Sequence, residues 1–225
     1  MAKICLYHGS NKIVARPVFG AGKACNDYGL GFYCTQNVEL AKEWACPMAD
    51  DGFVNCYELE TDGLKILDLQ AEDFCTLHWL SLLVNNRRFD LETPVMRQAV
   101  FYLKNNFLPD ISDFDVIKGY RADDSYFSFA RAFLSNQISY SQLNNAMRLG
   151  KLGEQIVLKS QKAFELIEFT GYEFAEGKVY FSKREKRMVE AKRDYKKSLE
   201  VDDISGFFIR DFILNEVKNG DARLR

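Results

Sequence analysis

The chain has 225 residues, of which 47% are hydrophobic and 14% aromatic, and its formal net charge is −2. This composition predicts a well-filled core, alone or with an appendage, and excludes a disordered chain. The near-neutral charge carries no signature of a protein that binds polyanions over its whole surface.

The cysteine and histidine content argues against a metal or redox cluster. All six cysteines lie in the first third of the chain, and no two have the C-x-x-C spacing. Only His8 and His78 are available to complete a zinc site, so no metal is expected. The sequence has no charged-then-apolar leader and no apolar run long enough to cross a membrane. Reduced thiols in a cytoplasmic protein are the simplest interpretation.

The first predicted strand covers residues 4–8 and ends in the motif Leu6-Tyr7-His8-Gly9-Ser10. Residues 11–27 are predicted to form a loop, because glycine and proline interrupt them. A single histidine at a strand end is more often a hydrogen-bonded structural residue than a catalytic one. The motif therefore gains weight only in combination with others.

The segment Asp27–Thr35 carries two glycines that allow a tight turn with close approach of the backbone. Residues 32–34 are typical of a short buried strand, and a helix follows. This places two flat aromatic faces, Tyr33 and Trp44, near a glycine backbone, which suits a flat ring on a phosphate-bearing ligand. The simpler interpretation is a turn followed by core aromatics. No third glycine opens the helix, which argues against a Rossmann or kinase phosphate loop.

The remaining elements follow from hydrophobic periodicity and from cap and turn signals. Further strands are predicted at 53–59, 64–69, 115–117, 153–158 and 167–169. Helices are predicted at 38–45 with Thr35 as N-cap, at 71–88, 94–107 and 126–134, after the capping box Ser139-x-x-Gln142, and at 161–166 and 207–217. A hairpin is predicted around Ala175–Lys178. The Asp123-Asp124 pair suggests a metal ligand pair or, more usually, a helix cap with a first-turn acid.

Residues 182–201 differ in composition, with eight Lys or Arg against four Asp or Glu. They predict a basic helix. A solvated helix face is the favoured interpretation, and a contact for nucleic acid or an acidic partner is the alternative.

Three separated motifs now combine: Leu-Tyr-His-Gly-Ser, Gly-Leu-Gly-Phe-Tyr with its helix, and Glu-Gln-Ile-Val-Leu on a late strand. In this order and spacing they resemble the ADP-ribosyltransferase superfamily, in the His-Tyr-Glu branch that contains the poly-ADP-ribose polymerases. The chain looks closest to a bacterial family of uncharacterised proteins with that fold. The resemblance covers residues 1 to about 175. It implies an α+β fold with a split, mostly antiparallel sheet and flanking helices. The expected domains are a catalytic domain at 1–181 and a basic helical extension at 182–225 that packs on it.

The resemblance implies a role for each matched residue. His8 would hydrogen-bond the adenosine-side ribose of NAD, and Gly9, followed by Ser10, would hold the nicotinamide carboxamide through its backbone. Tyr33 would pack in the nicotinamide pocket, and Trp44 stands where the polymerases place a stacking tyrosine. The polymerases' lysine and serine on this helix are replaced here by Leu40 and Ala41, which favours single transfer over chain elongation.

The catalytic carboxylate is assigned to Glu154 or its neighbour Gln155. Glu154 matches the polymerases' glutamate and would stabilise an oxocarbenium-like ribose by accepting from its hydroxyl. The bacterial relatives favour a glutamine in this strand, so the choice between the two residues stays open. Leu152 stands where many toxins of the superfamily have Glu or Gln, which argues against arginine as the acceptor.

The expected function is mono-ADP-ribosyl transfer from NAD, used as a substrate, to a nucleic-acid or protein acceptor. By resemblance, the protein is expected to be a bacterial toxin of a toxin–antitoxin or phage-defence system, with an antitoxin as a further partner. The alternatives are a catalytically silent binding or scaffold protein with the same fold, and an NAD glycohydrolase.

Overall fold

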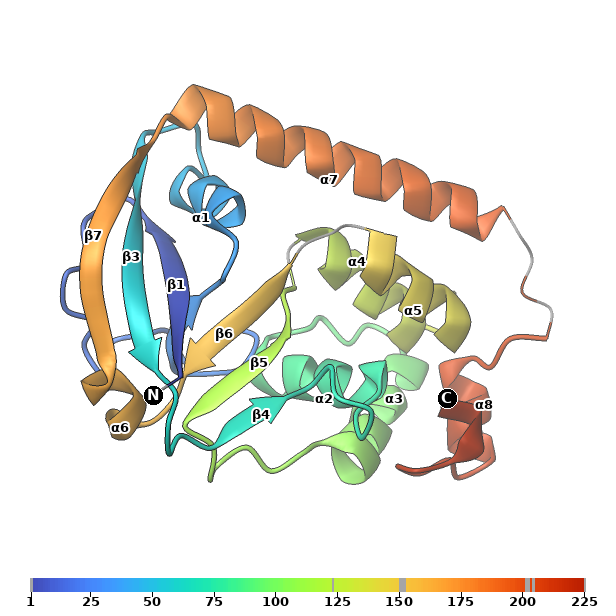
Figure 1. Cartoon of the computed structure of the whole chain (residues 1–225). Helices are drawn as coiled ribbons and strands as arrows, with labels where there is room; N and C mark the ends of the chain where they lie inside the picture. Colours follow the sequence, from blue (N-terminus) through green and yellow to red (C-terminus); the bar gives the residue numbers. More distant parts are fainter. Residues whose placement is uncertain (1, 123, 150–152, 201–202, 204, 225) are drawn as a thin grey trace. The chain divides into compact units, whose positions relative to one another are not determined.

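The computed structural model describes residues 2–122, 124–149, 153–200, 203 and 205–224 (Figure 1). The fold is α+β, as the sequence predicts. The chain forms two compact units. The first comprises Met1–Asp68, Asp110–Arg121 and Leu152–Arg187, and the second comprises Leu69–Pro109, Ala122–Lys151 and Met188–Arg225. The boundary between the units therefore does not fall at the expected position after residue 181.

The first unit contains two open sheets. The three-stranded sheet has the order β1-β3-β7 and is antiparallel throughout. The four-stranded sheet has the order β2-β6-β5-β4, and only its β4–β5 pair is parallel. The bounds are β1 Lys3–Ser10, β2 Phe32–Cys34, β3 Gly52–Glu60, β4 Ile66–Asp68, β5 Val116–Tyr120, β6 Glu154–Leu158 and β7 Ile167–Ala175, with α1 at Val38–Ala45 and α6 at Gln161–Glu165.

A hydrophobic core joins the two sheets. Leu6, Tyr57 and Leu59 of the three-stranded sheet pack with residues of the other sheet, namely Cys34, Val116, Ile156 and Leu158. Alternate side chains of a strand point to the same face. His8 therefore lies on the face that carries Leu6, and Glu154 lies on the face that carries Ile156. Both candidate residues project toward the space between the sheets.

Helix α1 follows β2 directly and packs beside β1 (Figure 1). Its N-cap is Asn37, whose side chain accepts from the N–H of Leu40 at 3.1 Å. The prediction of Thr35 as N-cap is therefore wrong. The Thr35 hydroxyl instead accepts from the N–H of Asn37 at 3.2 Å and so supports the turn that precedes the helix.

Strand β7 leads straight into α7, Gly177–Leu199. The hairpin predicted around Ala175–Lys178 is therefore absent, because Ala175 ends the strand and the helix begins two residues later. The N–H of Gly177 donates to the Asp51 carboxylate at 2.8 Å, which fixes this corner.

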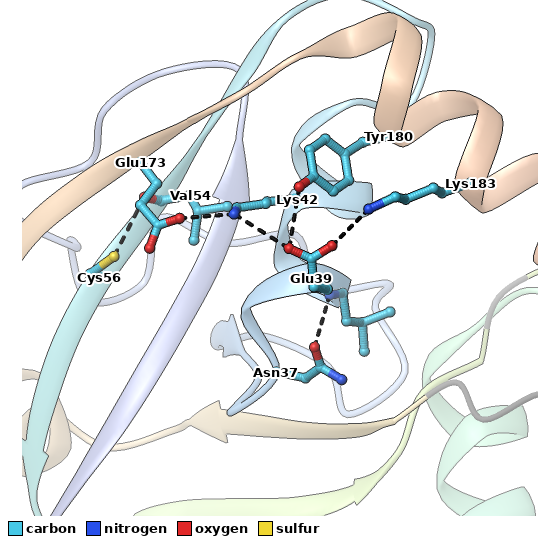
Figure 2. A network of polar contacts seen from close by, with 9 residues as sticks. Asn37, Glu39, Lys42, Val54, Cys56, Glu173, Tyr180 and Lys183 are labelled. Carbon is cyan, nitrogen blue, oxygen red and sulfur yellow. Dashed lines mark hydrogen bonds and ion pairs between the residues drawn. The ribbon is translucent and has the colours of Figure 1, made fainter.

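Figure 2 shows how α1 is bound by the start of α7 on one side and by β7 on the other. Glu39 on α1 lies 2.9 Å from the Lys183 ammonium and accepts from the Tyr180 hydroxyl at 3.2 Å. The Lys183 hydrogen bond lowers the pKa of Glu39 below its usual value. Lys42, also on α1, pairs with Glu173 of β7 at 2.9 Å. Three elements from distant parts of the sequence thus share one polar network.

The second unit is helical. Its elements are α2 Thr76–Asn86, α3 Pro94–Phe107, α4 Asp124–Leu134, α5 Tyr140–Leu149, α8 Ile209–Leu214, a short 3-10 turn at Ala222–Leu224, and the remainder of α7. The capping box of α5 is confirmed, since Ser139 and Gln142 exchange hydrogen bonds of 2.9 and 3.1 Å. The helices α2 and α8 are shorter than predicted. Of the acidic pair, Asp123 lies outside the described residues. No helix among the described residues is long and apolar enough to span a membrane.

Candidate functional site

All the predicted site residues belong to the first unit. They come from the end of β1, from β2, from α1 and from the start of β6. The set is His8, Gly9, Ser10, Tyr33, Trp44, Glu154 and Gln155. Strand β1 contacts both β2 and α1, and β2 pairs with β6.

His8 is fixed by a hydrogen bond of 2.7 Å between its Nδ1 and the carbonyl oxygen of Tyr33. A carbonyl can only accept, so Nδ1 carries the proton. Burial lowers the pKa of His8, and the hydrogen bond to Tyr33 raises it by a smaller amount. The imidazole is therefore neutral near pH 7, and Nε2 is left as an acceptor. The imidazole ring of His8 packs on the ring of Phe32, with 4.5 Å between the two ring centroids.

The pKa of both histidines, His8 and His78, is lowered by burial. Below pH 6.5 the unfolded chain binds protons that the folded chain does not, so the free energy of unfolding should fall as pH decreases. The slope should approach about 1.4 kcal/mol per pH unit for each histidine. Urea unfolding between pH 7.5 and 5 measures it, and His8→Gln should flatten the profile. A wild-type profile that is flat over this range would contradict the assignment.

Gly9 lies against α1. A Cβ atom at this position would stand 2.0 Å from the Ala41 carbonyl oxygen and 2.7 Å from the Ala45 nitrogen. Tyr7, two residues earlier, exchanges backbone hydrogen bonds of 2.8 and 3.0 Å with Thr35. Backbone groups alternate in direction along a strand, so the N–H and C=O of Gly9 point to this same edge of β1. The glycine thus allows helix packing, and its backbone groups face the β2 side. Nearby, the Ser10 hydroxyl accepts from the N–H of Lys12 at 3.4 Å.

Tyr33 organises the glycine turn through its hydroxyl group. The hydroxyl donates to the Gly29 carbonyl at 2.6 Å and accepts from the Tyr28 N–H at 3.1 Å. The Lys159 ammonium donates to the carbonyls of Tyr28 and Leu30 at 2.7 and 2.5 Å. Burial lowers the pKa of Lys159. Sequence reasoning missed this lysine, since nothing local connects it to a turn more than a hundred residues away.

Trp44 carries a cation over its ring. The Arg121 guanidinium carbon lies 4.7 Å from the ring centroid, within the range of a cation–π interaction. The Trp44 Nε1 atom is buried and has no hydrogen-bond partner among the described residues. Arg121 directly follows β5, whose last residue, Tyr120, pairs with Glu154. Sequence reasoning did not single out Arg121, although a basic residue at the end of a predicted strand was the available signal.

Glu154 and Gln155 project from opposite faces of β6. The Lys118 ammonium lies 3.1 Å from Glu154 Oε1 and 3.3 Å from the Asp68 carboxylate. The lysine thus neutralises Glu154 by proximity, although its direction does not complete a hydrogen bond to the buried Oε1. Gln155 is only 7% exposed, and its Oε1 has no hydrogen-bond partner among the described residues. Each face of β6 therefore presents one buried oxygen. Glu154 Oε1 has an ion pair with Lys118 but no hydrogen bond, and Gln155 Oε1 has neither among the described residues.

The basic residues at the start of α7 are used within the first unit. Lys183 pairs with Glu39 as described, and Arg187 lies 2.6 Å from Glu43. Arg184 donates to the carbonyl oxygen of Pro47 at 3.1 Å. This part of the 182–201 segment is therefore neither a purely solvated face nor free to bind an external polyanion. It holds α1, which carries Trp44.

Arg187→Met should destabilise the protein by about 3 kcal/mol, because it leaves the mostly buried Glu43 carboxylate without its partner. Lys183→Met is the matched control. Both side chains of its pair with Glu39 are about half exposed, so the loss should be clearly smaller than for Arg187→Met. Chemical denaturation measures both. Equal losses in the two variants would show that the Arg187 pair does not hold α1.

Among the described residues, no group of three or more His, Cys, Asp or Glu side chains is placed to hold a metal ion.

One family model, described as a protein of unknown function (DUF3990), matches residues 4–169. The matched range contains every predicted site residue and ends within β7. No curated protein and no solved structure matches the chain.

Proposed function

The chain belongs to the DUF3990 family of proteins of unknown function, and we propose from the site itself that it transfers ADP-ribose from NAD to a macromolecular acceptor. The proposal combines the resemblance of three sequence motifs with the unused polar atoms of the site.

The observation that carries the proposal is the set of buried polar atoms on α1 and β6. Trp44 Nε1 is a donor, and the Oε1 atoms of Glu154 and Gln155 are acceptors on opposite faces of β6, so only one of the two can meet the same ligand group. Glu154 Oε1 also forms an ion pair with Lys118. A buried polar atom without a partner costs about 1–3 kcal/mol, so such an atom in a folded protein calls for water, an ion or a ligand group to complete it. The nicotinamide riboside part of NAD offers matching groups, because its carboxamide both donates and accepts and its ribose hydroxyls donate. The two elements are those to which the resemblance assigns this part of NAD.

In the proposed reaction, the bond between nicotinamide and its ribose breaks, and nicotinamide leaves with the bonding electrons as a neutral molecule. Glu154 accepts from a ribose hydroxyl and stabilises the positive charge that develops on the sugar. Lys118 holds the carboxylate in place through their ion pair. His8 accepts from an adenosine-side ribose hydroxyl at Nε2. A nucleophile of the acceptor then forms the new bond to the anomeric carbon and loses its proton to solvent.

Single transfer is favoured over chain elongation. Leu40 and Ala41 stand where the polymerases have a lysine and a serine, and both are buried in the packing of α1. Neither side chain is available to engage a growing polymer. We further propose that the protein acts in the bacterial cytoplasm as a toxin, under the control of an antitoxin.

Trp44→Phe tests whether the buried indole N–H binds NAD, because it keeps an aromatic ring and removes the unpaired N–H. The free energy of unfolding should not fall by more than about 1 kcal/mol, since no hydrogen bond among the described residues is lost. Affinity for NAD should fall about tenfold, since a ligand hydrogen bond is worth about 1.4 kcal/mol. Calorimetric titration and urea unfolding measure the two quantities. Unchanged NAD affinity would show that the indole N–H does not serve the ligand.

The test of function is to offer adenine-labelled NAD to the purified protein together with RNA, DNA and cell lysate. Label on a macromolecule is the expected result. Free labelled ADP-ribose without a labelled macromolecule would favour NAD hydrolysis, and unchanged NAD would favour the silent binding protein.

A further inference from the structure

We propose that the acceptor is a single-stranded nucleic acid, and that it binds an exposed aromatic patch next to His8 together with the loop at 11–26. This inference rests on the proposed function and names its substrate class. The patch, called the aromatic platform below, consists of Phe53, Tyr172 and Phe174.

The platform lies on the face of the three-stranded sheet that carries His8. In the register of the sheet, His8 pairs with Asn55 and Asn55 with Tyr172. Paired residues of neighbouring strands share a face. The next row of the same face pairs Phe53 with Phe174. Tyr172 therefore lies in the same row as His8, and Phe53 and Phe174 lie in the next row on the same face.

Two of the three platform rings are exposed, and the half-buried Phe53 contacts both of them. Tyr172 and Phe174 are 54% and 58% exposed, which is unusual for large apolar side chains on a sheet. Phe53 contacts both edge-on, with ring centroids at 5.7 and 6.3 Å. Glu173 lies between them in the sequence but points to the opposite face, where it pairs with Lys42 (Figure 2). The platform thus presents aromatic faces without an adjacent carboxylate from its own strand.

The loop at 11–26 supplies positive charge, and its start lies beside the platform. It contains Lys12, Arg16 and Lys23 and no acidic residue. All three side chains are exposed, and the structure gives none of them an ion pair within the described residues. Asn55 anchors the start of the loop, because its amide accepts from the Val14 N–H at 2.6 Å and donates to the Lys12 carbonyl at 3.2 Å. The backbone at Lys12 is therefore fixed one row from Phe53.

Exposed aromatic rings beside basic side chains fit a single strand better than a duplex or a protein. Unpaired bases stack on such rings whatever their sequence, while lysine and arginine contact the backbone phosphates. A duplex offers no unstacked base to the rings. A strand that stacks here would lie on the face of the sheet that carries His8, beside the proposed NAD site, and its nucleophile must from there reach the anomeric carbon of the nicotinamide ribose.

The experiment measures binding of the full-length protein to a fluorescein-labelled 20-nucleotide single strand by anisotropy between 50 and 200 mM salt. The logarithm of the binding constant should fall linearly with the logarithm of salt, by about 0.7 for each phosphate contact. The double variant Tyr172→Ala/Phe174→Ala should bind about 100-fold more weakly. Lys12→Glu/Arg16→Glu should weaken binding and reduce the salt slope. Phe101→Ala is the matched control, because Phe101 is 70% exposed in the second unit and should have no effect.

Nicotinamide release from NAD, measured without an acceptor, distinguishes a failure of the acceptor proposal from a failure of the proposed ADP-ribosyl transfer. The platform variants should retain it, since their residues do not belong to the proposed NAD site. Three results would overturn the inference while nicotinamide release persists: no binding of the strand, equal binding by all variants, or label transferred to protein alone. Loss of NAD affinity in the platform variants would also overturn it, because the platform would then belong to the NAD site.

Discussion

Glu154→Gln is expected to lower the turnover of NAD by about 10²–10³, the usual effect of losing one preorganised contact to the transition state. The substitution keeps the shape of the side chain and removes its charge. Affinity for NAD should change little, because the carboxylate contributes mainly once positive charge develops on the ribose. Steady-state kinetics of nicotinamide release and calorimetric titration of NAD measure the two effects separately.

Asp68→Asn is the matched control for this substitution. Asp68 also pairs with Lys118, at 3.3 Å, so the variant removes a neighbouring carboxylate from the same lysine. It should retain turnover.

Because Glu154 and Gln155 lie on opposite faces of β6, Gln155→Ala completes the test. Full activity in Glu154→Gln together with an inactive, folded Gln155→Ala would move the ribose contact to the other face of the strand.

Gly9→Ala should cause the largest loss of stability, about 3 kcal/mol or more, because the added Cβ would overlap the backbone of α1. The Ala41 carbonyl oxygen would lie 2.0 Å away, and a helix backbone cannot move aside as a flexible side chain can. Displacement of α1 would also displace Trp44, so NAD binding should be lost together with stability. Thermal and urea unfolding, followed by NAD titration of the folded fraction, check both effects.

Gly20→Ala provides the comparison for Gly9→Ala. A Cβ at Gly20 would meet no atom within 4 Å, although the backbone φ of +80° disfavours alanine there. This strain should cost about 1 kcal/mol. If Gly9→Ala is no more destabilising than Gly20→Ala, α1 does not pack on β1 as described.

Elements with strong local signals could be predicted from the sequence. Pro94 in the first turn and an apolar stripe predict α3 at 94–107, which is confirmed, with Thr93 as its N-cap. Residues 32–34 are the strand that the pattern predicts. Local signals failed where two residues had similar propensity. Thr35 and Asn37 are both good N-caps, and only the structure shows that Asn37 occupies the position.

Features that depend on distant parts of the chain could not be predicted. Gly177 resembles a turn residue in the sequence. In the structure it packs against the backbone of Ala49 and Asp50 and begins α7, whose basic residues meet acids on α1 more than a hundred residues away. The same limit applies to the site. The motifs place His8 and Glu154 on strands, but they do not indicate that Lys118 pairs with Glu154, because the register of β5 against β6 decides that contact.

The most direct test of the central claim is to incubate the purified full-length protein with NAD and to quantify the nicotinamide released. We expect release by the wild-type protein, and a rate lower by about 10²–10³ in Glu154→Gln at equal NAD affinity. A folded wild-type protein that binds NAD and releases no nicotinamide, with or without single-stranded nucleic acid and lysate present, would contradict it.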